Sequence, residues 1–326
     1  MYKIAIAGYR HSHIGELFSK CEGTAQIVAC CNAAPDFAEK LNANHPEVKI
    51  LECSVEQMLQ EVECDIVAVG DAYGRRGSAA ITALHYGRHV IADKPLCTSF
   101  EELSEIRQRS AEQKLSVGYM LPLWSTANAM TARKMIAAGD LGEIQGINFT
   151  GHHPLNYGTR PSWYWEKGLH GGTINDIAPH GLDLIEYVTG MKFGSPVAAR
   201  TWNQAFPEVP HFNNGAQFMT QLENGAGVTA DVSYFSPRFG LPAYWRFSFW
   251  GTKGWLEFNG TDGVLFGTKD EEAHSVPLEA AGVDYWRCFL DEIEGRPHAY
   301  FNKEHIFDLT ETTLDIQRLA DTESVK

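Results

Sequence analysis

An aspartate and a histidine near the middle of the chain have a spacing that suits acid–base chemistry. Asp176 and His180 lie in the segment 171–183, Gly-Gly-Thr-Ile-Asn-Asp-Ile-Ala-Pro-His-Gly-Leu-Asp. If this segment is helical, residues four apart share one face, so a carboxylate lies beside an imidazole. Two leading glycines and the internal Pro179 favour a helix that opens close to neighbouring backbone and bends. The alternative is an ordinary surface pair beside a loop, because a single motif is only a hypothesis.

A lysine far upstream supports the functional interpretation. Lys94 follows the apolar run 89–92 in the sequence Asp-Lys-Pro-Leu. A solvated surface lysine is the ordinary alternative. However, a lysine at the carboxyl end of a strand in an open α/β sheet faces the crevice where ligands bind. The sequence therefore predicts a site that combines Lys94 with Asp176 and His180.

Composition limits the kind of protein. A chain of 326 residues exceeds the size at which single cores stop growing, so two domains are expected. A formal net charge of −14 argues against nucleic acid or a membrane surface as the main partner and favours a small-molecule substrate. No stretch approaches the roughly 18 apolar residues of a membrane span, so we expect a soluble, cytoplasmic protein. The seven cysteines lack metal-finger spacing and are expected to be reduced and mostly buried.

The first 121 residues predict a dinucleotide-binding domain. A short apolar strand at 3–8 ends on Gly8, and a helical segment follows at 14–18. Strand, tight turn and helix are the opening of such a domain. Later segments alternate between strands and helices. The strands are expected at 26–31, 64–70, 89–92 and 115–120, and the helices at 37–44, 55–61, 77–86 and 100–114. This alternation predicts a doubly wound parallel sheet.

Residues 122–326 have a different pattern of hydrophobic and polar residues. A helix is expected at 127–138, and turn glycines separate alternating, aromatic-rich segments after it. These segments predict strands at 144–150, 197–202, 216–222, 227–233, 244–250 and 254–258. Helices return at 284–294 and 304–321. The pattern predicts an α+β domain with an antiparallel sheet, whose last helices can pack back on the first domain.

Three separated segments together resemble one family. Residues 93–96, Asp-Lys-Pro-Leu, are similar to the Glu-Lys-Pro signature of the Gfo/Idh/MocA oxidoreductases, with Asp in place of Glu. Residues 171–183 resemble that family's glycine-rich D-x-x-x-H-x-x-D segment, and residues 294–297, Glu-Gly-Arg-Pro, resemble its C-terminal turn. The features occur in the family's order across most of the chain.

The resemblance implies a Rossmann domain with a doubly wound parallel sheet. For residues 122–326 it implies an α+β domain with an open, mostly antiparallel sheet, which serves substrate binding and oligomerisation. It also implies that NAD or NADP serves to oxidise or reduce a sugar, polyol or related carbonyl compound. Lys94 then lies between nicotinamide and substrate, His180 is the acid–base residue, and Asp176 binds substrate or orients His180. The chemistry agrees, because a near-neutral imidazole can take the hydroxyl proton and an ammonium stabilises the forming carbonyl oxygen.

The cofactor loop departs from the family's pattern. Arg10 and His13 stand where G-x-G-x-x-G has its second and third glycines, and Asn32 replaces the acidic residue that meets the ribose. Arg10 is expected to turn outward and pair with a phosphate. Asp71, Ala72 and Tyr73 replace the usual Thr-Pro-Asn, and Arg76 the usual His. The residues expected to meet the cofactor are Gly8, Tyr9, Arg10, His11, His13, Asn32, Asp71, Ala72, Tyr73, Arg76, Asp93, Lys94 and Pro95.

An aromatic loop ahead of Gly171 is the expected substrate-selecting segment. Aromatic rings stack on sugar faces, and an arginine binds hydroxyl or carboxylate groups; core packing is the alternative for the tryptophans. The residues expected to bind substrate are Lys94, Tyr119, His153, Arg160, Trp163, Trp165, Asp176 and His180. His152, His153, Asp176 and His180 could instead gather zinc or manganese, but their spacing is not a recognised metal pattern, so we expect no metal.

Two further functions fit the same residues. One is a hydrolase or lyase that uses tightly held NAD to oxidise a sugar transiently, with no net redox change. The other is a noncatalytic sugar-binding or regulatory protein that lost the cofactor, and the side chains at positions 10, 13 and 71 favour this reading. Fold alone does not choose between these and a dehydrogenase.

Aromatic residues on the predicted strands of the second domain suggest self-association. An exposed aromatic face of that size is unfavourable, so it predicts an interface in a homo-oligomer, a dimer or tetramer. Cover by the chain's own helices is the alternative. The residues in question are Tyr234, Phe235, Trp245, Phe247 and Phe249.

Overall fold

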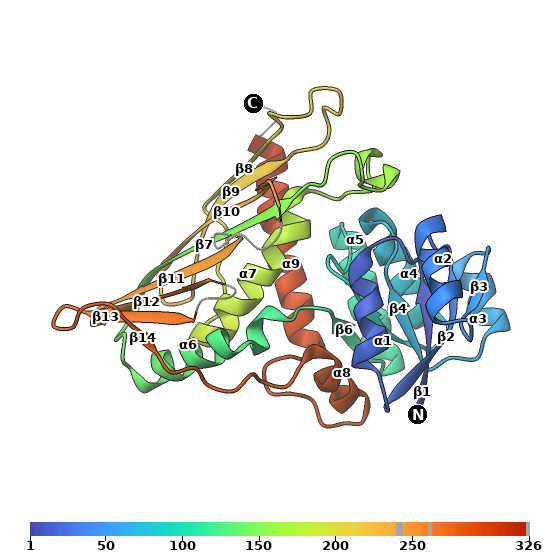
Figure 1. Cartoon of the computed structure of the whole chain (residues 1–326), viewed down its shortest axis with the longest axis horizontal. Helices are drawn as coiled ribbons and strands as arrows, with labels where there is room; N and C mark the ends of the chain where they lie inside the picture. Colours follow the sequence, from blue (N-terminus) through green and yellow to red (C-terminus); the bar gives the residue numbers. More distant parts are fainter. Residues whose placement is uncertain (239–243, 260–262, 324–326) are drawn as a thin grey trace. The chain divides into compact units, whose positions relative to one another are not determined.

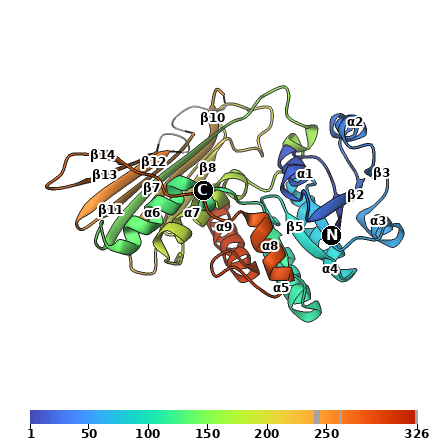
Figure 2. The same ribbon diagram turned by 60° about the horizontal axis from the view of Figure 1, so that its bottom comes forward.

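A computed structural model of the 326-residue chain describes all residues except 239–243, 260–262 and 324–326. The chain divides into two compact units, and Figures 1 and 2 label their elements. The first unit comprises Met1–Met120, Pro161–Gly171 and Asp284–Glu311. The second comprises Leu121–Arg160, Gly172–Val283 and Thr312–Lys326. The chain therefore passes between the units several times, rather than once at residue 121.

The first unit is built on a six-stranded sheet in the order β3-β2-β1-β4-β5-β6. Every pairing in it is parallel, which confirms the predicted doubly wound α/β class. Strands such as Ile-Val-Ala-Val of β4 are buried on both faces, as parallel strands covered by helices must be. The strands are β1 (Tyr2–Ala7), β2 (Ala25–Cys31), β3 (Lys49–Leu51), β4 (Ile66–Val69), β5 (His89–Ala92) and β6 (Val117–Tyr119). Strand β3 was not predicted; it has three residues, none of them fully buried.

Side chains cap the N-termini of α3, α5 and α8 in the first unit. Ser54 and Ser99 accept hydrogen bonds from the third helical amides of α3 and α5. The helices are α1 (Leu17–Lys20), α2 (Pro35–Asn44), α3 (Val55–Glu61), α4 (Tyr73–His85), α5 (Phe100–Gln113), α8 (Tyr285–Ile293) and the first part of α9 (Lys303–Glu323).

Two predicted helices differ from the structure. Residues 14–18 are not one α-helix, because a 3₁₀ turn, η1 (Ser12–Glu16), precedes the single turn of α1. Helix α4 begins four residues before its predicted start at Gly77. That glycine serves packing rather than initiation, since a Cβ there would lie 2.2 Å from Glu102 Cδ.

The second unit is built on an eight-stranded sheet in the order β14-β13-β12-β11-β7-β10-β9-β8. Its pairings are antiparallel except for β7 with β10, which confirms the predicted mostly antiparallel sheet. The strands are β7 (Ile144–Pro154), β8 (Ala198–Trp202), β9 (Gly215–Gln221), β10 (Gly227–Ser236), β11 (Trp245–Gly251), β12 (Gly254–Asn259), β13 (Val264–Thr268) and β14 (His274–Val276). The last two strands were not predicted.

One face of this sheet is covered by helices α6 (Ala127–Ala138) and α7 (Thr173–Thr189), as Figure 1 shows. The aromatic residues predicted to form an oligomer interface mostly lie on that covered face. Tyr234, Trp245, Phe247 and Phe249 are buried, and only Phe235 is exposed. That interface prediction was therefore wrong for these four residues, because the chain's own helices cover them, the alternative weighed from the sequence.

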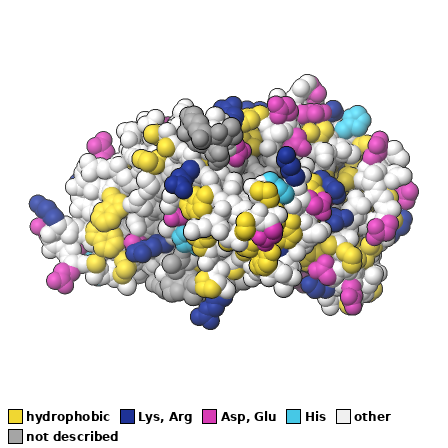
Figure 3. All heavy atoms as spheres, turned by 90° about the horizontal axis from the view of Figure 1, so that it is seen from above, with side chains coloured by type: hydrophobic (Ala, Val, Ile, Leu, Met, Phe, Trp, Pro, Cys, Tyr) yellow, Lys and Arg dark blue, Asp and Glu magenta, His cyan; other side chains and the backbone are white. Residues whose placement is uncertain are grey.

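The state of the cysteines and the distribution of charge on the surface agree with what the composition suggests. All seven cysteines are free thiols, and only Cys53 is not buried. On the face drawn in Figure 3, Lys and Arg side chains lie among acidic ones instead of forming a continuous basic band. Within the described ranges, no helix has both the length and the hydrophobicity needed to cross a bilayer.

Candidate active site

Helix α7 runs through the core of the second unit. A side chain of α9 accepts a hydrogen bond from its first turn. Gly172, the N-cap, has φ of +102°, a conformation that side chains disfavour. The amide of Ile174 donates to Gln317 Oε1 at 3.1 Å, and a Cβ on Gly172 would lie 2.2 Å from that same oxygen. Gly172 therefore allows Gln317 to satisfy an amide that the first turn of α7 leaves unbonded.

Asp176 and His180 both project from α7 and are both buried. The helix predicted from their spacing is present, so they share one face. The hydroxyl of Tyr234, on β10, donates to Asp176 Oδ2, which orients that carboxylate. The imidazole of His180 meets the ring of Trp245, on β11, edge to face at 5.7 Å between centroids.

Further aromatic and polar groups of the second unit surround this pair. The His153 ring lies 4.5 Å from that of Tyr244 and 5.4 Å from that of Trp245. Burial raises the pKa of the Tyr244 phenol, the Asp176 carboxylate raises it further, and Arg160 opposes both. Tyr244 therefore stays neutral and can donate a hydrogen bond. Such a mixture of rings, hydroxyls and ionisable groups suits a polyhydroxylated ligand.

Sequence reasoning did not assign Tyr234 or Tyr244 to the site. Tyr234 continues the alternation of buried residues in β10, and that alternation also describes plain core residues. Only the register of β10 against its neighbours and its contact with α7 reveal the bond to Asp176.

In the first unit, Asp93 and Lys94 follow the carboxyl end of β5. Asp93 is fully buried, and its carboxylate accepts from Arg76 Nη2 at 2.9 Å. Arg76 Nη1 donates to the carbonyl of Lys94, so one guanidinium holds both residues. The Lys94 side chain is only 2% exposed, and its ammonium lies 5.8 Å from the Tyr73 ring centroid. Lys94 is therefore a positioned, buried cation rather than a solvated surface lysine.

Two imidazoles complete the surroundings of Asp93. His11 Nδ1 lies 2.6 Å from Asp93 Oδ2, and His13 Nδ1 lies 3.3 Å from Oδ1. Burial lowers the pKa of His11 to about 4, against the opposing effect of Asp93, so His11 is neutral near pH 7 and donates Nδ1–H. Burial alone would raise the pKa of Asp93, but the Arg76 guanidinium and the histidines hold it well below its usual range.

The trio His11, His13 and Asp93 also has the grouping of metal ligands, since its donor atoms lie within 4.8 Å of one another. It is the one such group among the residues that the structure describes, so the four residues weighed from the sequence do not form one. Arg76 already compensates the charge of Asp93. A divalent ion there would add buried positive charge beside a guanidinium, which is unfavourable. The histidines and Asp93 are therefore a hydrogen-bonded cluster.

The aromatic loop predicted to select substrate is divided between the units. Trp163 and Trp165 belong to the first unit with residues 161–171, whereas His153 and Arg160 belong to the second. Trp163 Nε1 donates to the carbonyl of Arg10 at 3.4 Å. Arg160 donates to the carbonyls of Leu155 and Pro154, so it braces its own loop.

Other aromatic residues of the first unit form hydrogen bonds within it. The hydroxyls of Tyr73 and Tyr164 lie 2.8 Å apart, and Tyr73 Oη lies 3.4 Å from His11 Nε2. Tyr119, expected to bind substrate, is buried, and its hydroxyl accepts the amide of Leu96 at 3.2 Å. Tyr119 thereby supports the backbone that follows Pro95.

The turn after β1, residues 8–13, is called the nucleotide turn. It begins with a glycine in the left-handed conformation. Gly8 has φ of +75°, and a Cβ there would lie 2.5 Å from that of Asp71. At the next position, the ring of Tyr9 stacks on Phe37 at 4.4 Å. Asn32, directly after β2, also has positive φ, at 53°.

The pairing of Arg10 in this turn differs from the expectation. Its Nε lies 3.3 Å from Asp71 Oδ1, so the guanidinium pairs within the chain rather than turning outward. The turn nevertheless fits a dinucleotide, because Gly8 keeps the tight bend at the carboxyl edge of the sheet and Arg10 carries charge complementary to phosphate.

These features define a class: oxidoreductases in which a doubly wound nucleotide-binding unit is joined to an α+β unit. The chain belongs to the GFO/IDH/MocA oxidoreductase family. Residues 2–120 match the family model described as "Oxidoreductase family, NAD-binding Rossmann fold", and residues 129–257 match that of the GFO/IDH/MocA C-terminal domain. The family suggested by the sequence motifs is thus confirmed.

Similar proteins include sugar and polyol dehydrogenases. The chain is 24% identical to the levoglucosan dehydrogenase of Pseudarthrobacter phenanthrenivorans over 54% of this chain and 45% of that protein. It is 25% identical to a scyllo-inositol 2-dehydrogenase (NAD(+)) of Bacillus subtilis over 70% and 62%, respectively. The matched region thus spans about half the length of the first of these relatives.

Solved structures share the fold over nearly the whole chain. A putative oxidoreductase from Thermotoga maritima aligns with a TM-score of 0.87 at 24% identity, covering 98% of both chains. A levoglucosan dehydrogenase in complex with NADH and levoglucosan aligns with a TM-score of 0.78 at 17% identity, covering 99% of this chain and 98% of that one.

Proposed function

We propose that the protein is an NAD(P)-dependent oxidoreductase that transfers a hydride to or from a secondary alcohol or carbonyl carbon of a sugar or polyol. The observation that carries the proposal is the buried pair Asp176 and His180 on α7, in a chain whose first unit holds the buried Lys94 at the carboxyl end of its parallel sheet. Family membership and the names of the relatives support the reaction class.

Each residue has a role that its surroundings support. His180 takes the hydroxyl proton of an alcohol during oxidation and returns it during reduction. Asp176, oriented by Tyr234, accepts a neighbouring substrate hydroxyl or orients His180. Lys94 stabilises negative charge on the reacting oxygen, and Arg76 positions it by holding the Lys94 carbonyl.

In the proposed division of labour, the first unit binds the dinucleotide and the second binds the substrate. Gly8, Arg10 and Asn32 would hold the diphosphate and the adenosine end, and the nicotinamide would supply the hydride acceptor or donor. Relatives named for NAD(+) and for NADP(+) both exist, so we propose a nicotinamide cofactor of either kind.

The buried free thiols support a cytoplasmic location, which imaging a tagged chain would test.

The first test measures cofactor binding and then turnover. We expect purified protein to bind NADH or NADPH in a fluorescence titration, and to reduce NAD(+) or NADP(+) with levoglucosan, an inositol or a glucoside. Absorbance at the nicotinamide band should rise in proportion to ketone product. Product formed with no net change in that absorbance would indicate the hydrolase or lyase reaction instead. Failure of every nicotinamide nucleotide to bind would contradict the proposal and favour a noncatalytic protein.

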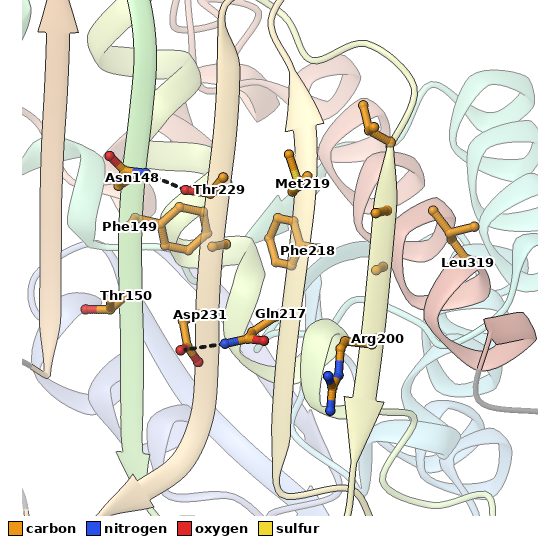
Figure 4. A pocket seen from close by; sticks show the side chains of 14 residues that line it. Asn148, Phe149, Thr150, Arg200, Gln217, Phe218, Met219, Thr229, Asp231 and Leu319 are labelled. Atoms are coloured by element: carbon orange, nitrogen blue, oxygen red, sulfur yellow. Dashed lines mark hydrogen bonds between the residues drawn. The ribbon is translucent and has the colours of Figure 1, made fainter.

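We also propose that the chain forms a homo-oligomer, a dimer or tetramer, through the uncovered face of the eight-stranded sheet. Large apolar side chains are exposed there, including Met219 and Trp250, each 49% exposed. Figure 4 shows part of this face, where Asn148, Thr229, Asp231, Gln217 and Met219 project from β7, β10 and β9 into a hollow that Leu319 of α9 also lines. Its polar centre, with Gln217 bonded to Asp231, suits a partner sheet that supplies further hydrogen bonds.

Sedimentation velocity provides the test of this assembly. Wild-type protein should sediment as a dimer or tetramer, and Met219→Lys with Trp250→Lys should shift it to monomer, because buried ammonium groups would be unpaired. Leu278→Lys, at an exposed residue outside the sheet, is the matched control. A wild-type monomer, or an oligomer that survives the double substitution, would rule out this interface.

A further inference from the structure

We propose that Arg10 and Asp71 form a latch on the nucleotide turn. In the free protein Arg10 pairs with Asp71, and on binding it leaves that partner for the diphosphate of the dinucleotide. The free energy needed to separate Arg10 from Asp71 is therefore lost from the free energy of cofactor binding. This inference rests on the proposed function and names residues that set the affinity of its cofactor site.

Two backbone amides of the turn are already used within the first unit. In a glycine-rich turn, backbone N–H groups point at the diphosphate. Here the amide of Gly8 donates to the carbonyl of Cys31 at 3.0 Å, and the amide of Arg10 donates to that of Gly70 at 3.0 Å. These two donors are used within the unit, so side chains must supply more of the recognition.

The element after the turn is also poorly suited to binding phosphate. A long α-helix would present its positive end to the diphosphate. The structure has the 3₁₀ turn η1, whose hydrogen bonds are less well aligned, followed by the four residues of α1. The missing helix charge leaves a cationic side chain as the principal anion-binding group.

Asp71 occupies the place that an approaching diphosphate would meet. Its side chain packs directly on Gly8, since a Cβ on that glycine would lie 2.5 Å from Asp71 Cβ and 2.7 Å from its Cγ. Its Oδ1 accepts the amide of Ala72 at 2.6 Å, which fixes the carboxylate. A fixed, buried negative charge at the turn repels phosphate.

Arg10 is held in a way that permits exchange. Its Nε is enclosed 3.3 Å from Asp71 Oδ1, but the two atoms do not have hydrogen-bond geometry. The Arg10 side chain is 30% exposed, whereas that of Asp71 is 8% exposed. A guanidinium binds phosphate through two parallel hydrogen bonds, a better match than this single ion pair. Because the pair must break first, its free energy is subtracted from that of binding.

The test measures NADH and ADP-ribose dissociation constants for wild type, Asp71→Asn, Arg10→Ala, the double variant and two control variants of the full chain. Asp71→Asn should tighten binding about tenfold, since it removes the repulsion and the competing partner while its amide oxygen still accepts from Ala72. Arg10→Ala should weaken binding about tenfold or more. The double variant should fall between the two single variants. Arg246→Ala and Glu257→Gln, which break an exposed pair in the second unit, should leave both constants unchanged.

The outcomes separate this inference from the proposed function. If wild type binds NADH and neither single variant changes the constant, or Asp71→Asn weakens it, the latch is wrong and the proposed function stands. If wild type binds NADH weakly and Asp71→Asn binds it about tenfold more tightly, the latch is supported. If neither binds, both proposals are overturned. Thermal unfolding midpoints for each variant establish that a weakened form is still folded.

Discussion

Replacing Lys94 with alanine should lower kcat by about a hundredfold or more while NADH still binds. The ammonium is buried at the end of β5, where it is the proposed source of positive charge for the reacting oxygen. Charge in a water-excluded site is worth far more than charge in solvent, so its removal raises the barrier to the chemical step. Steady-state kinetics on the substrate found in the cofactor-linked screen provide the measurement.

Two companion variants make that result specific. Lys94→Met keeps the buried volume of the side chain and should lose the same activity, which separates charge from packing. Lys269→Ala removes an exposed lysine, 86% accessible at its side chain, and should retain full activity. Wild-type kcat in Lys94→Met would refute the proposed role of the ammonium, because folding and volume would then be intact.

The sequence was most informative where periodicity and chain order act together. Alternating buried strands and capped helices predicted the parallel sheet, because strands covered on both faces must be apolar throughout. Helix α7 and the placement of Asp176 and His180 on one face followed from a spacing of four. Strands β3, β13 and β14 were missed. Three to five residues define a period weakly, and the equally short β6 and β8 were found only as parts of the longer segments 115–120 and 197–202.

The sequence was least informative about side-chain partners distant along the chain. Arg10, His13, Asp71, Tyr73 and Arg76 looked like separate departures from the family's pattern. In the structure Arg10 pairs with Asp71, and His13 and Arg76 contact the carboxylate of Asp93. Tyr73 contacts His11, which lies on the same carboxylate. The apparent loss of a motif is therefore a set of mutually compensating contacts, and only the distances between β1, β4 and β5 could reveal it.

The aromatic residues of the second unit illustrate a different limit. The alternation along β10 and β11 identifies one face of the sheet, but it does not say whether helices or another chain cover that face. Residues 127–138 and 173–189 are both amphipathic or apolar enough to provide the cover. Which face they choose depends on the connections between sheet and helices, so the interface was assigned to the wrong side.

Replacing His180 with alanine should lower kcat by about two to three orders of magnitude, the typical contribution of a positioned acid–base group. His180 is buried, meets the ring of Trp245 edge to face and lies one turn from Asp176, so alanine would leave a cavity without a positioned base. The variant should therefore lose the pH dependence that the imidazole imposes on kcat/KM, and added imidazole should restore part of the rate. His274→Ala, at an exposed histidine on β14, is the control and should leave both unchanged.

The comparison with Asp176→Asn decides how the acid–base function is shared. An amide keeps the hydrogen bond from Tyr234 but cannot hold charge, so KM should rise and the pH profile should persist if Asp176 binds a substrate hydroxyl. If Asp176 instead orients His180, kcat should fall with KM unchanged. A His180→Ala enzyme with wild-type rates and an unchanged pH profile would remove the imidazole from the mechanism and leave Lys94 as the acid–base group.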